Sequence, residues 1–194
     1  RRASVIVGED GNVEWVNLAK VSPSASQGSR SVTAGGARLE AVTVSADGTR
    51  AAVGGADGRI AILDASGNVQ VSWVAHPNGV RALLFLGDGA MLASAGADKV
   101  IRIWDARSGQ ARGELSGHQN DVNALTAGTD AATLISASSD GSARVWNWQS
   151  GAMQLTFNAG EPLQAAALSP DKHTLAVGGR GKSVYVYDLK IPAG

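Results

Sequence analysis

Short runs in which apolar and polar residues alternate recur along the chain. Val100-Ile101-Arg102-Ile103-Trp104 and Val184-Tyr185-Val186-Tyr187 are two such runs, and both are rich in β-branched and aromatic residues. Alternation with a period of two over about four to eight residues predicts a β-strand. No stretch combines a 3.6-residue period with helix-capping signals over ten or more residues. The pattern therefore predicts an all-β chain and disfavours a parallel sheet with crossover helices.

The same turn recurs at nearly constant spacing. Its anchor position is occupied by Asp10, Asp57, Asp98, Asp140 and, in the last copy, Gly181. The intervals between these anchors are 47, 41, 42 and 41 residues. Self-similarity at this period indicates stacked modules of a single fold. An immunoglobulin-like sandwich does not require such regular spacing, so it is a poorer explanation.

The third copy divides into four short strands separated by glycine-containing turns. The expected strands run from Val80 to Leu86, Ala90 to Ala95, Val100 to Trp104 and Ala111 to Leu115. The gaps contain Gly-Asp-Gly, Gly-Ala-Asp and Ser-Gly, which suit tight turns. Four short antiparallel strands of this kind form one blade of a β-propeller.

An apolar residue followed by Asp or Asn lies six residues beyond each anchor. The pairs are Val16-Asn17, Leu63-Asp64, Trp104-Asp105, Trp146-Asn147 and Tyr187-Asp188. Together with Gly117-His118, they resemble the WD-repeat family, whose blades carry Gly-His before the innermost strand and Trp-Asp at the end of the third. The resemblance implies a β-propeller of four-stranded antiparallel WD-repeat blades. About four and a half blades are expected here, as part of a larger, seven-bladed ring.

Residues 1–194 are expected to form a single WD-repeat region with blade parts at approximately 1–34, 35–75, 76–117, 118–159 and 160–194. The first and last parts have room for only three strands each. Propellers use about four to eight blades, which leaves three interpretations. The chain is a fragment of a longer propeller, a second chain completes the ring, or the two incomplete end blades pair to close a small ring. The last would overfill one four-stranded blade.

The resemblance also implies a buried hydrogen-bonded chain in each of two blades. Its members are His76, Ser94, Asp98 and Trp104 in one blade, and His118, Ser136, Asp140 and Trp146 in the next. A hydrolase triad is the competing interpretation. It is disfavoured because the set occurs twice and no Gly-x-Ser-x-Gly motif accompanies either serine. In the last copy Ala159, Val177 and Gly181 replace three polar members together.

One face of the ring commonly binds partners in this family. Carried over position by position, that face contains Glu40, Arg81, Asn123 and Gln164, together with Ser139 and Arg180 beside the anchor turns. A solvated rim without a partner is the alternative for each residue. Trp15, Trp73 and Trp148 lie outside the recurring tryptophan position. Packing between blades is the favoured role for them, and exposed binding anchors are the alternative.

Composition narrows the function. The 194 residues contain 17 basic and 17 acidic side chains, so no strong field predicts nucleic acid as a partner. The absence of cysteine excludes thiolate metal sites and leaves the compartment open. His173 lacks a second ligand at suitable spacing, so neither a metal nor a cofactor is expected. No apolar segment is long enough for membrane insertion.

The predicted function is non-catalytic. We expect an interaction scaffold that recognises other proteins or another domain of the same polypeptide. The alternative is the propeller domain of a larger enzyme or redox protein whose catalytic or cofactor domain lies outside this chain. Both rest on analogy at the level of the fold.

Overall fold

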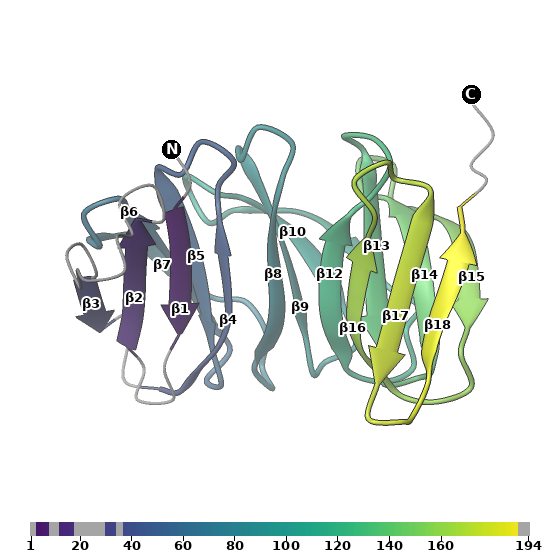
Figure 1. The fold of residues 1–194 in the computed structure, drawn as a ribbon. Helices are drawn as coiled ribbons and strands as arrows, with labels where there is room; N and C mark the ends of the chain where they lie inside the picture. Colours follow the sequence, from purple (N-terminus) through teal and green to yellow (C-terminus); the bar gives the residue numbers. More distant parts are fainter. Residues whose placement is uncertain (1–2, 8–11, 18–29, 34–36, 190–194) are drawn as a thin grey trace, which may run out of the picture.

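Five antiparallel sheets make up the described part of the chain. The computed structural model describes residues 3–7, 12–17, 30–33 and 37–189, and gives side chains for residues 37–189. Within these ranges there are 18 strands in sheets of three, four, four, four and three strands (Figure 1). The described residues contain no helix that could cross a membrane.

Within each sheet the strands follow one another along the chain, and each pairs with its neighbour in sequence. The first sheet contains β1 (Ala3–Val7), β2 (Asn12–Asn17) and β3 (Arg30–Thr33). The second contains β4 (Leu39–Val44), β5 (Arg50–Gly55), β6 (Arg59–Asp64) and β7 (Val69–Val74). The third contains β8 (Val80–Leu86), β9 (Met91–Gly96), β10 (Ile101–Asp105) and β11 (Ala111–Leu115). The fourth contains β12 (Val122–Ala127), β13 (Thr133–Ser138), β14 (Ser142–Asn147) and β15 (Ala152–Asn158). The fifth contains β16 (Leu163–Leu168), β17 (Thr174–Gly179) and β18 (Val184–Asp188).

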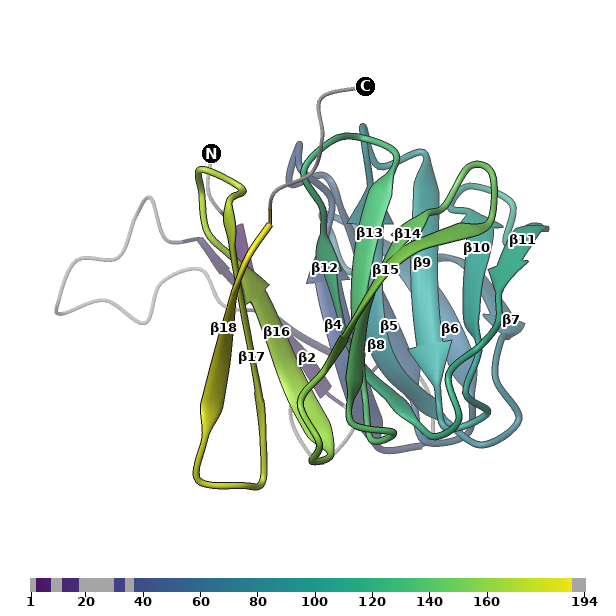
Figure 2. The same ribbon diagram turned by 90° about the vertical axis from the view of Figure 1, so that its right-hand side faces the viewer.

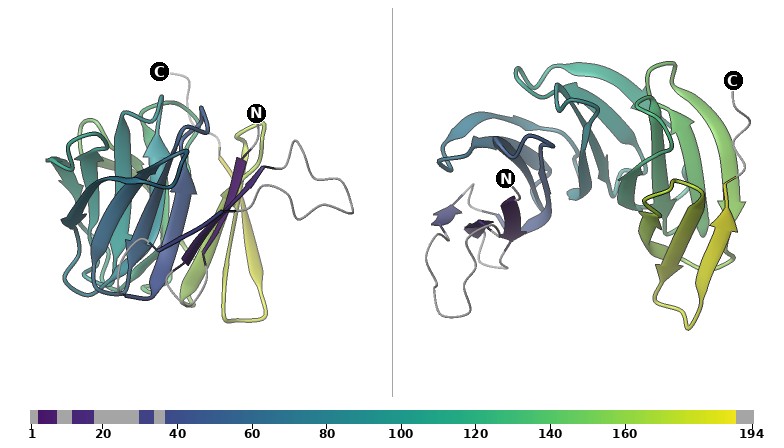
Figure 3. Two further views of the ribbon diagram at one scale, coloured as in Figure 1. Left: turned by 90° about the vertical axis from the view of Figure 1, so that its left-hand side faces the viewer. Right: turned by 45° about the horizontal axis from the view of Figure 1, so that its top comes forward.

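The sheets are arranged as an arc. The inner strands β4, β8, β12 and β16 lie beside one another in that order, and β1 lies beside β4. The right-hand view of Figure 3 shows this arc from above, with β1–β3 at one end and β16–β18 at the other. These two end sheets are separate and are not hydrogen-bonded to each other among the described strands. The structure thus confirms an all-β fold of propeller blades, whereas a seven-bladed ring stays a prediction.

The core lies between the sheets. Ile101 and Ile103 of β10 pack against the fourth sheet, where Leu134 and Trp146 belong to the same buried cluster. Equivalent pairs lie on the third strands of the neighbouring sheets. They are Ile60 and Ile62 on β6, and Ala143 and Val145 on β14, and none of these six residues is more than 1% exposed. Apolar layers between successive sheets therefore hold the arc together.

The observed strands agree closely with the expected ones. In the third sheet β9 and β10 are each displaced by one residue from the expected bounds, so that Gly96 and Asp105 belong to strands. Gly96 is included because it pairs with Val80 on β8.

Two of the three additional tryptophans have the packing role expected of them. Trp73 is partly buried, and its ring centroid lies 5.5 Å from that of Trp104 in the next sheet. Trp148 packs against the cluster between the third and fourth sheets and donates its Nε1 hydrogen to the carbonyl of Ala131 at 2.9 Å. The side chain of Trp15 lies outside those that the structure describes.

Truncating a buried leucine at a sheet interface tests this account of the core. We expect Leu134→Ala to lower the free energy of unfolding by about 2–5 kcal/mol, because the fully buried side chain leaves a cavity between two sheets. Urea titration followed by tryptophan fluorescence measures the change. Leu155→Ala is the matched control, since Leu155 on β15 is 40% exposed. Equal losses in the two variants would contradict the interface account.

Candidate functional site

The third sheet contains a buried chain of four polar side chains. The indole Nε1 of Trp104 donates to Ser94 Oγ at 2.7 Å. Ser94 Oγ lies 2.7 Å from Nε2 of His76, and Nδ1 of His76 lies 2.8 Å from Asp98. Arg102 also donates to the Asp98 carboxylate. The structure therefore brings together all four residues singled out in this blade.

The fourth sheet repeats the arrangement. Trp146 Nε1 donates to Ser136 Oγ at 2.8 Å, and Ser136 Oγ lies 2.7 Å from His118 Nε2. Nδ1 of His118 lies 2.8 Å from Asp140. The Asp140 carboxylate also accepts hydrogen bonds from Ser142 and from the backbone of Gln119.

The chemistry of the donors fixes the direction of each chain. An indole can only donate, and the imidazole nitrogen that faces a carboxylate must carry a hydrogen. The other imidazole nitrogen therefore accepts the serine hydroxyl hydrogen. Each chain runs from tryptophan through serine and histidine to aspartate, with every group satisfied.

The side chains of these two hydrogen-bonded chains are buried, unlike those of a catalytic triad with similar geometry. Ser94, Ser136 and His76 are fully buried, and His118 is 5% exposed. A nucleophile must reach a substrate carbonyl, whereas these hydroxyls are enclosed between sheets and already accept an indole hydrogen. The arrangement serves to join the loop before each inner strand to the second and third strands of its sheet.

Two glycines allow the backbone to approach His76. Gly58 has a φ of 79°, and a Cβ at this position would lie 1.6 Å from the His76 carbonyl oxygen. At Gly96 a Cβ would lie 2.6 Å from His76 Nδ1. A larger residue at either position would displace the histidine from its hydrogen-bonded place.

Burial sets the protonation of the histidines. It lowers the pKa of His76 and of His118 below the ordinary value, although the neighbouring aspartates partly oppose this effect. For Asp98 burial alone would raise the pKa, but hydrogen bonds from Arg102 and His76 outweigh it, so the pKa is lowered. The pKa of Asp140 is lowered in the same way by Ser142, Gln119 and His118. The chains consequently hold neutral histidines beside ionised aspartates at neutral pH.

In the fifth sheet a glutamate lies beside the anchor turn, where the other sheets have the anchor aspartate. A Cβ on Gly181 would lie 1.6 Å from a carboxylate oxygen of Glu161, so this carboxylate packs against the anchor turn that lacks aspartate. The other oxygen, Oε1, is buried and has no hydrogen-bond partner among the described residues. Val177 replaces the serine and is 1% exposed. Nothing at the anchor position itself signals the involvement of Glu161.

The candidate face residues share a backbone irregularity. In β4, β8, β12 and β16 the pairing with the next strand slips by one residue near the start of the strand. The unpaired residues at these bulges are Glu40, Arg81, Asn123 and Gln164. A β-bulge turns its extra side chain away from the regular alternation of the strand. Four equivalent side chains are thereby directed to the same end of the arc.

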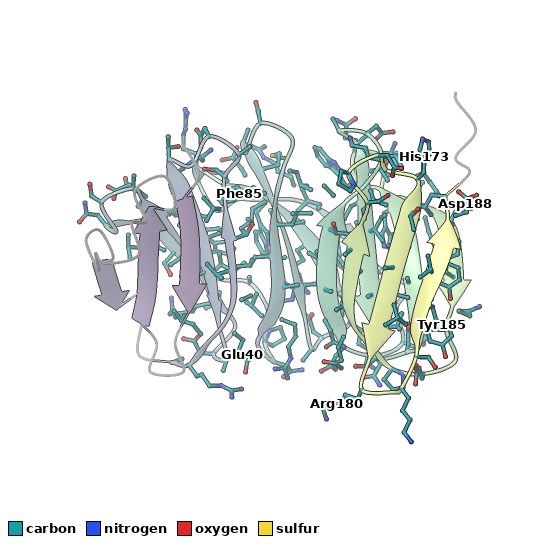
Figure 4. All side chains as sticks on the ribbon, viewed as in Figure 1. Glu40, Phe85, His173, Arg180, Tyr185 and Asp188 are labelled. Atoms are coloured by element: carbon teal, nitrogen blue, oxygen red, sulfur yellow. The ribbon has the colours of Figure 1, made fainter. Side chains whose placement is uncertain are left out.

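These side chains line a shared hollow. One part has a volume of about 460 Å³ and another of about 350 Å³, and both are lined by Arg81, Asn123 and Gln164. We call the two parts together the polar hollow. Its other lining residues include Arg38 and Glu40 at one end and Asp121, Ser139 and Arg180 toward the other. Figure 4 shows Glu40 and Arg180 along the lower edge of the arc, away from His173 and Phe85. The structure thus gathers all six candidate residues around one feature that crosses four sheets.

Most of these groups also connect neighbouring sheets. Arg81 forms an ion pair with Glu40 of the second sheet, and its Nε lies 3.8 Å from Asp121 before the fourth sheet. Asn123 donates to Ser139 and to the carbonyl of Leu163 in the fifth sheet, both at 2.7 Å. By contrast, Gln164 and Arg180 are exposed and have no side-chain hydrogen bond within residues 37–189. The hydrogen-bond donors of these two side chains therefore have no partner among the described residues.

The described residues provide no obvious metal centre. No group of three or more histidine, aspartate or glutamate side chains among them is arranged to hold a metal ion. His173 lies on the turn between β16 and β17, where its backbone amide donates to Asp171.

The fold and the buried chains define a class of protein. Four-stranded antiparallel sheets arranged in an arc, with their first strands innermost, are blades of a β-propeller. The family described as "WD domain, G-beta repeat" matches residues 67–105 and 109–147. Each matched range begins at the fourth strand of one sheet and continues through the first three strands of the next.

A relative gives the same assignment. Over 77 residues the chain is 35% identical to "WD repeat-containing protein 1" of Xenopus tropicalis. The similarity covers 38% of this chain and 13% of the length of that relative. Residues 67–105 and 109–147 thus match WD repeats, in agreement with the resemblance that the motifs show to this family.

Removal of one serine hydroxyl tests the buried chain. We expect Ser136→Ala to lower the free energy of unfolding by about 1–3 kcal/mol, because it leaves Trp146 Nε1 and His118 Nε2 buried without a partner. Ser116→Ala is the control, because Ser116 is exposed and bonds only the exposed Glu114. Urea unfolding measures both variants. Coincident unfolding curves for the two variants would show that the buried hydrogen bonds of Ser136 add no stability.

The lowered histidine pKa values predict a direction for the pH dependence. Below about pH 6.5 the unfolded chain takes up protons at positions 76 and 118 that the folded chain does not bind. Stability should therefore be complete above this pH and fall as the pH drops toward the lowered pKa values, by at most about 1.4 kcal/mol per pH unit for each histidine. Urea titrations at several pH values between 7.5 and 5 measure the slope. Stability that rises on acidification over this range would refute neutral buried imidazoles.

Proposed function

We propose that this WD-repeat chain is a non-catalytic scaffold that binds a segment of another protein, or of another domain of its own polypeptide, in the polar hollow. WD-repeat proteins generally act as interaction scaffolds. The observation that carries the proposal is the repeated bulge. It directs one side chain from each of four sheets into a common hollow. Ser139 and Arg180 also line this hollow.

The unused groups indicate the chemistry of the bound segment. Arg180 offers guanidinium donors that no acid among the described residues occupies, and Gln164 offers both an amide donor and an acceptor. Guanidinium groups bind carboxylates through two parallel hydrogen bonds. A polar, extended segment that places a carboxylate at Arg180 and a backbone amide at Gln164 would fit these groups.

The remaining charges limit what this segment can carry. Arg81 is held between Glu40 and Asp121, so its charge is already compensated. The end of the hollow near Glu40 also contains Arg38, which is paired with Glu40. The Arg180 end is therefore where an acidic side chain gains most, and the bound segment is oriented by its acidic residue.

A peptide selection tests this proposal directly. Peptides selected from a displayed random library for binding to the chain should be enriched in aspartate or glutamate. The double variant Gln164→Ala/Arg180→Ala should weaken their binding about tenfold or more, as measured by isothermal titration. Both side chains are exposed and unpaired among the described residues, so the substitutions leave the fold intact.

The matched control carries the same substitutions elsewhere. Gln154 on β15 and Arg107 on the turn between β10 and β11 are exposed and lie away from the hollow. Gln154→Ala/Arg107→Ala should leave the affinity unchanged. If the control variant loses binding as strongly as the hollow variant, or if the selected peptides show no acidic preference, the proposed site is wrong.

A further inference from the structure

A methionine on the outermost strand of the fourth sheet has an exposed side chain whose sulfur accepts two hydrogen bonds. This residue, Met153 on β15, is 51% exposed. Its Sδ accepts from Thr156 Oγ1 at 3.3 Å and from Arg144 Nη1 at 3.7 Å. Figure 2 shows β15, which holds Met153 and Thr156, beside β14, which holds Arg144. We call these three residues the thioether site. A thioether is only a weak acceptor, so the sulfur makes poor use of the two donors.

The third sheet has an arginine at the equivalent place, but its surroundings differ. Arg102 lies two residues before the tryptophan of its strand, as Arg144 does in the fourth sheet. Arg102 is paired with the anchor aspartate of the third sheet, and its Nε lies 3.7 Å from Glu114. The strand pairing that sets Glu114 opposite Arg102 sets Thr156 opposite Arg144. Within residues 37–189 Arg144 comes no closer than 4.0 Å to any carboxylate. The guanidinium of the fourth sheet therefore lacks the strong acceptor that its counterpart has.

The packing around Arg144 directs one nitrogen of its guanidinium toward the sulfur. Its Nε donates to Ser142 Oγ at 3.3 Å, while Nη1 faces Met153. The guanidinium lies over the Trp146 ring, 6.0 Å from the ring centroid. Gly117 also lies against it, since a Cβ at that position would be 2.6 Å from Nη1. A stronger acceptor added at the sulfur would thus meet a donor that is already in place.

Met153 has the more accessible of the two sulfur-containing side chains in the sequence. Residues 1–194 contain no cysteine and two methionines. The other methionine, Met91 at the start of β9, is partly buried and packs against the cluster between the third and fourth sheets. Peroxides oxidise a thioether to a sulfoxide, and exposure favours the reaction. We therefore expect this chemistry at Met153 before Met91.

We propose that Met153 is a site of reversible oxidation by hydroperoxides, and that Arg144 and Thr156 hold the oxygen of the resulting sulfoxide. With hydrogen peroxide, a sulfur lone pair attacks one peroxide oxygen, and the S–O bond forms as the O–O bond breaks. The hydrogen of the transferred oxygen moves to the other oxygen, which leaves as water. Sulfur thereby loses two electrons and the peroxide gains them. A dithiol reductant reverses the oxidation, becomes a disulfide and releases the oxygen as water.

The donors make this sulfoxide different from one in a protein core. Methionine oxidation usually disrupts a core because it introduces a polar oxygen among apolar side chains. At Met153 the new oxygen meets two donors and supplies the acceptor that Arg144 lacks, so it should stabilise the folded chain. None of the three residues of the thioether site lines the polar hollow, and the proposal is therefore independent of the proposed function.

Peroxide treatment of the full chain tests the selectivity. Both methionines are followed in one sample by peptide mass spectrometry during exposure to dilute hydrogen peroxide. We expect the sulfoxide to form about tenfold or more faster at Met153 than at Met91. Equal rates, or faster oxidation of Met91, would overturn the proposal.

Urea titration of oxidised and reduced chains tests the role of the two donors. Met91→Leu is introduced first, because this volume-conserving change leaves Met153 as the single methionine. We expect oxidation to raise the folding equilibrium constant of this chain about threefold or more, through the hydrogen bonds to the sulfoxide oxygen. In the further variant Arg144→Leu/Thr156→Val, oxidation should no longer raise that constant.

Each oxidised variant is compared with its own reduced form, so that the cost of a substitution cancels. Arg107→Leu, on the exposed turn between β10 and β11, is the matched control and should keep the full effect of oxidation. Thr156→Val alone removes one exposed hydroxyl and should keep only part of it, which decides the matter if the double variant does not fold. An unchanged or lowered folding constant on oxidation of the Met91→Leu chain would overturn the proposal. An effect of oxidation that is equal with and without the donors would overturn it as well.

Discussion

A sheet with two apolar faces is stable only between two other sheets, and this constraint governs the whole chain. The third and fourth sheets each have β-branched side chains of the third strand on one face and a leucine and a tryptophan on the other. Neither face can remain in water without loss of the hydrophobic free energy that orders the strands. Successive sheets satisfy each other, which produces the arc. The regular spacing of the anchors is the sequence counterpart of this stacking, since each repeat supplies the same two surfaces.

The buried polar chains are compatible with this apolar stacking only because they are complete. Ser136 and its partners lie between sheets where water cannot replace a missing hydrogen bond. The fifth sheet shows the alternative, in which Ala159, Val177 and Gly181 remove three members at once and Glu161 approaches the turn. Histidine, serine and aspartate within hydrogen-bonding distance thus do not define an enzyme. Access to solvent decides whether the same set of atoms can act on a substrate.

The sequence predicted the parts of the structure that depend on local pattern. Alternation located the strands to within one residue in the third sheet, and the resemblance to WD repeats located the members of both buried chains. The bulges at Glu40, Arg81, Asn123 and Gln164 could not be predicted, because a bulge depends on the register between two strands and leaves no fixed residue type. The packing of Glu161 against Gly181 was missed for a similar reason, since the two residues lie in different loops.

The polar hollow crosses four sheets, and this geometry gives a bound ligand a second role. A segment that contacts Glu40 at one end and Arg180 at the other bridges three successive sheet interfaces. Such a ligand binds only while those interfaces are intact, so occupancy and folding are thermodynamically linked. At a free concentration of about one hundred times its dissociation constant it would add about 2.7 kcal/mol to the stability of the arc. The bound ligand would then hold neighbouring sheets together, and the blades would resist mechanical or thermal separation most strongly when the scaffold is occupied.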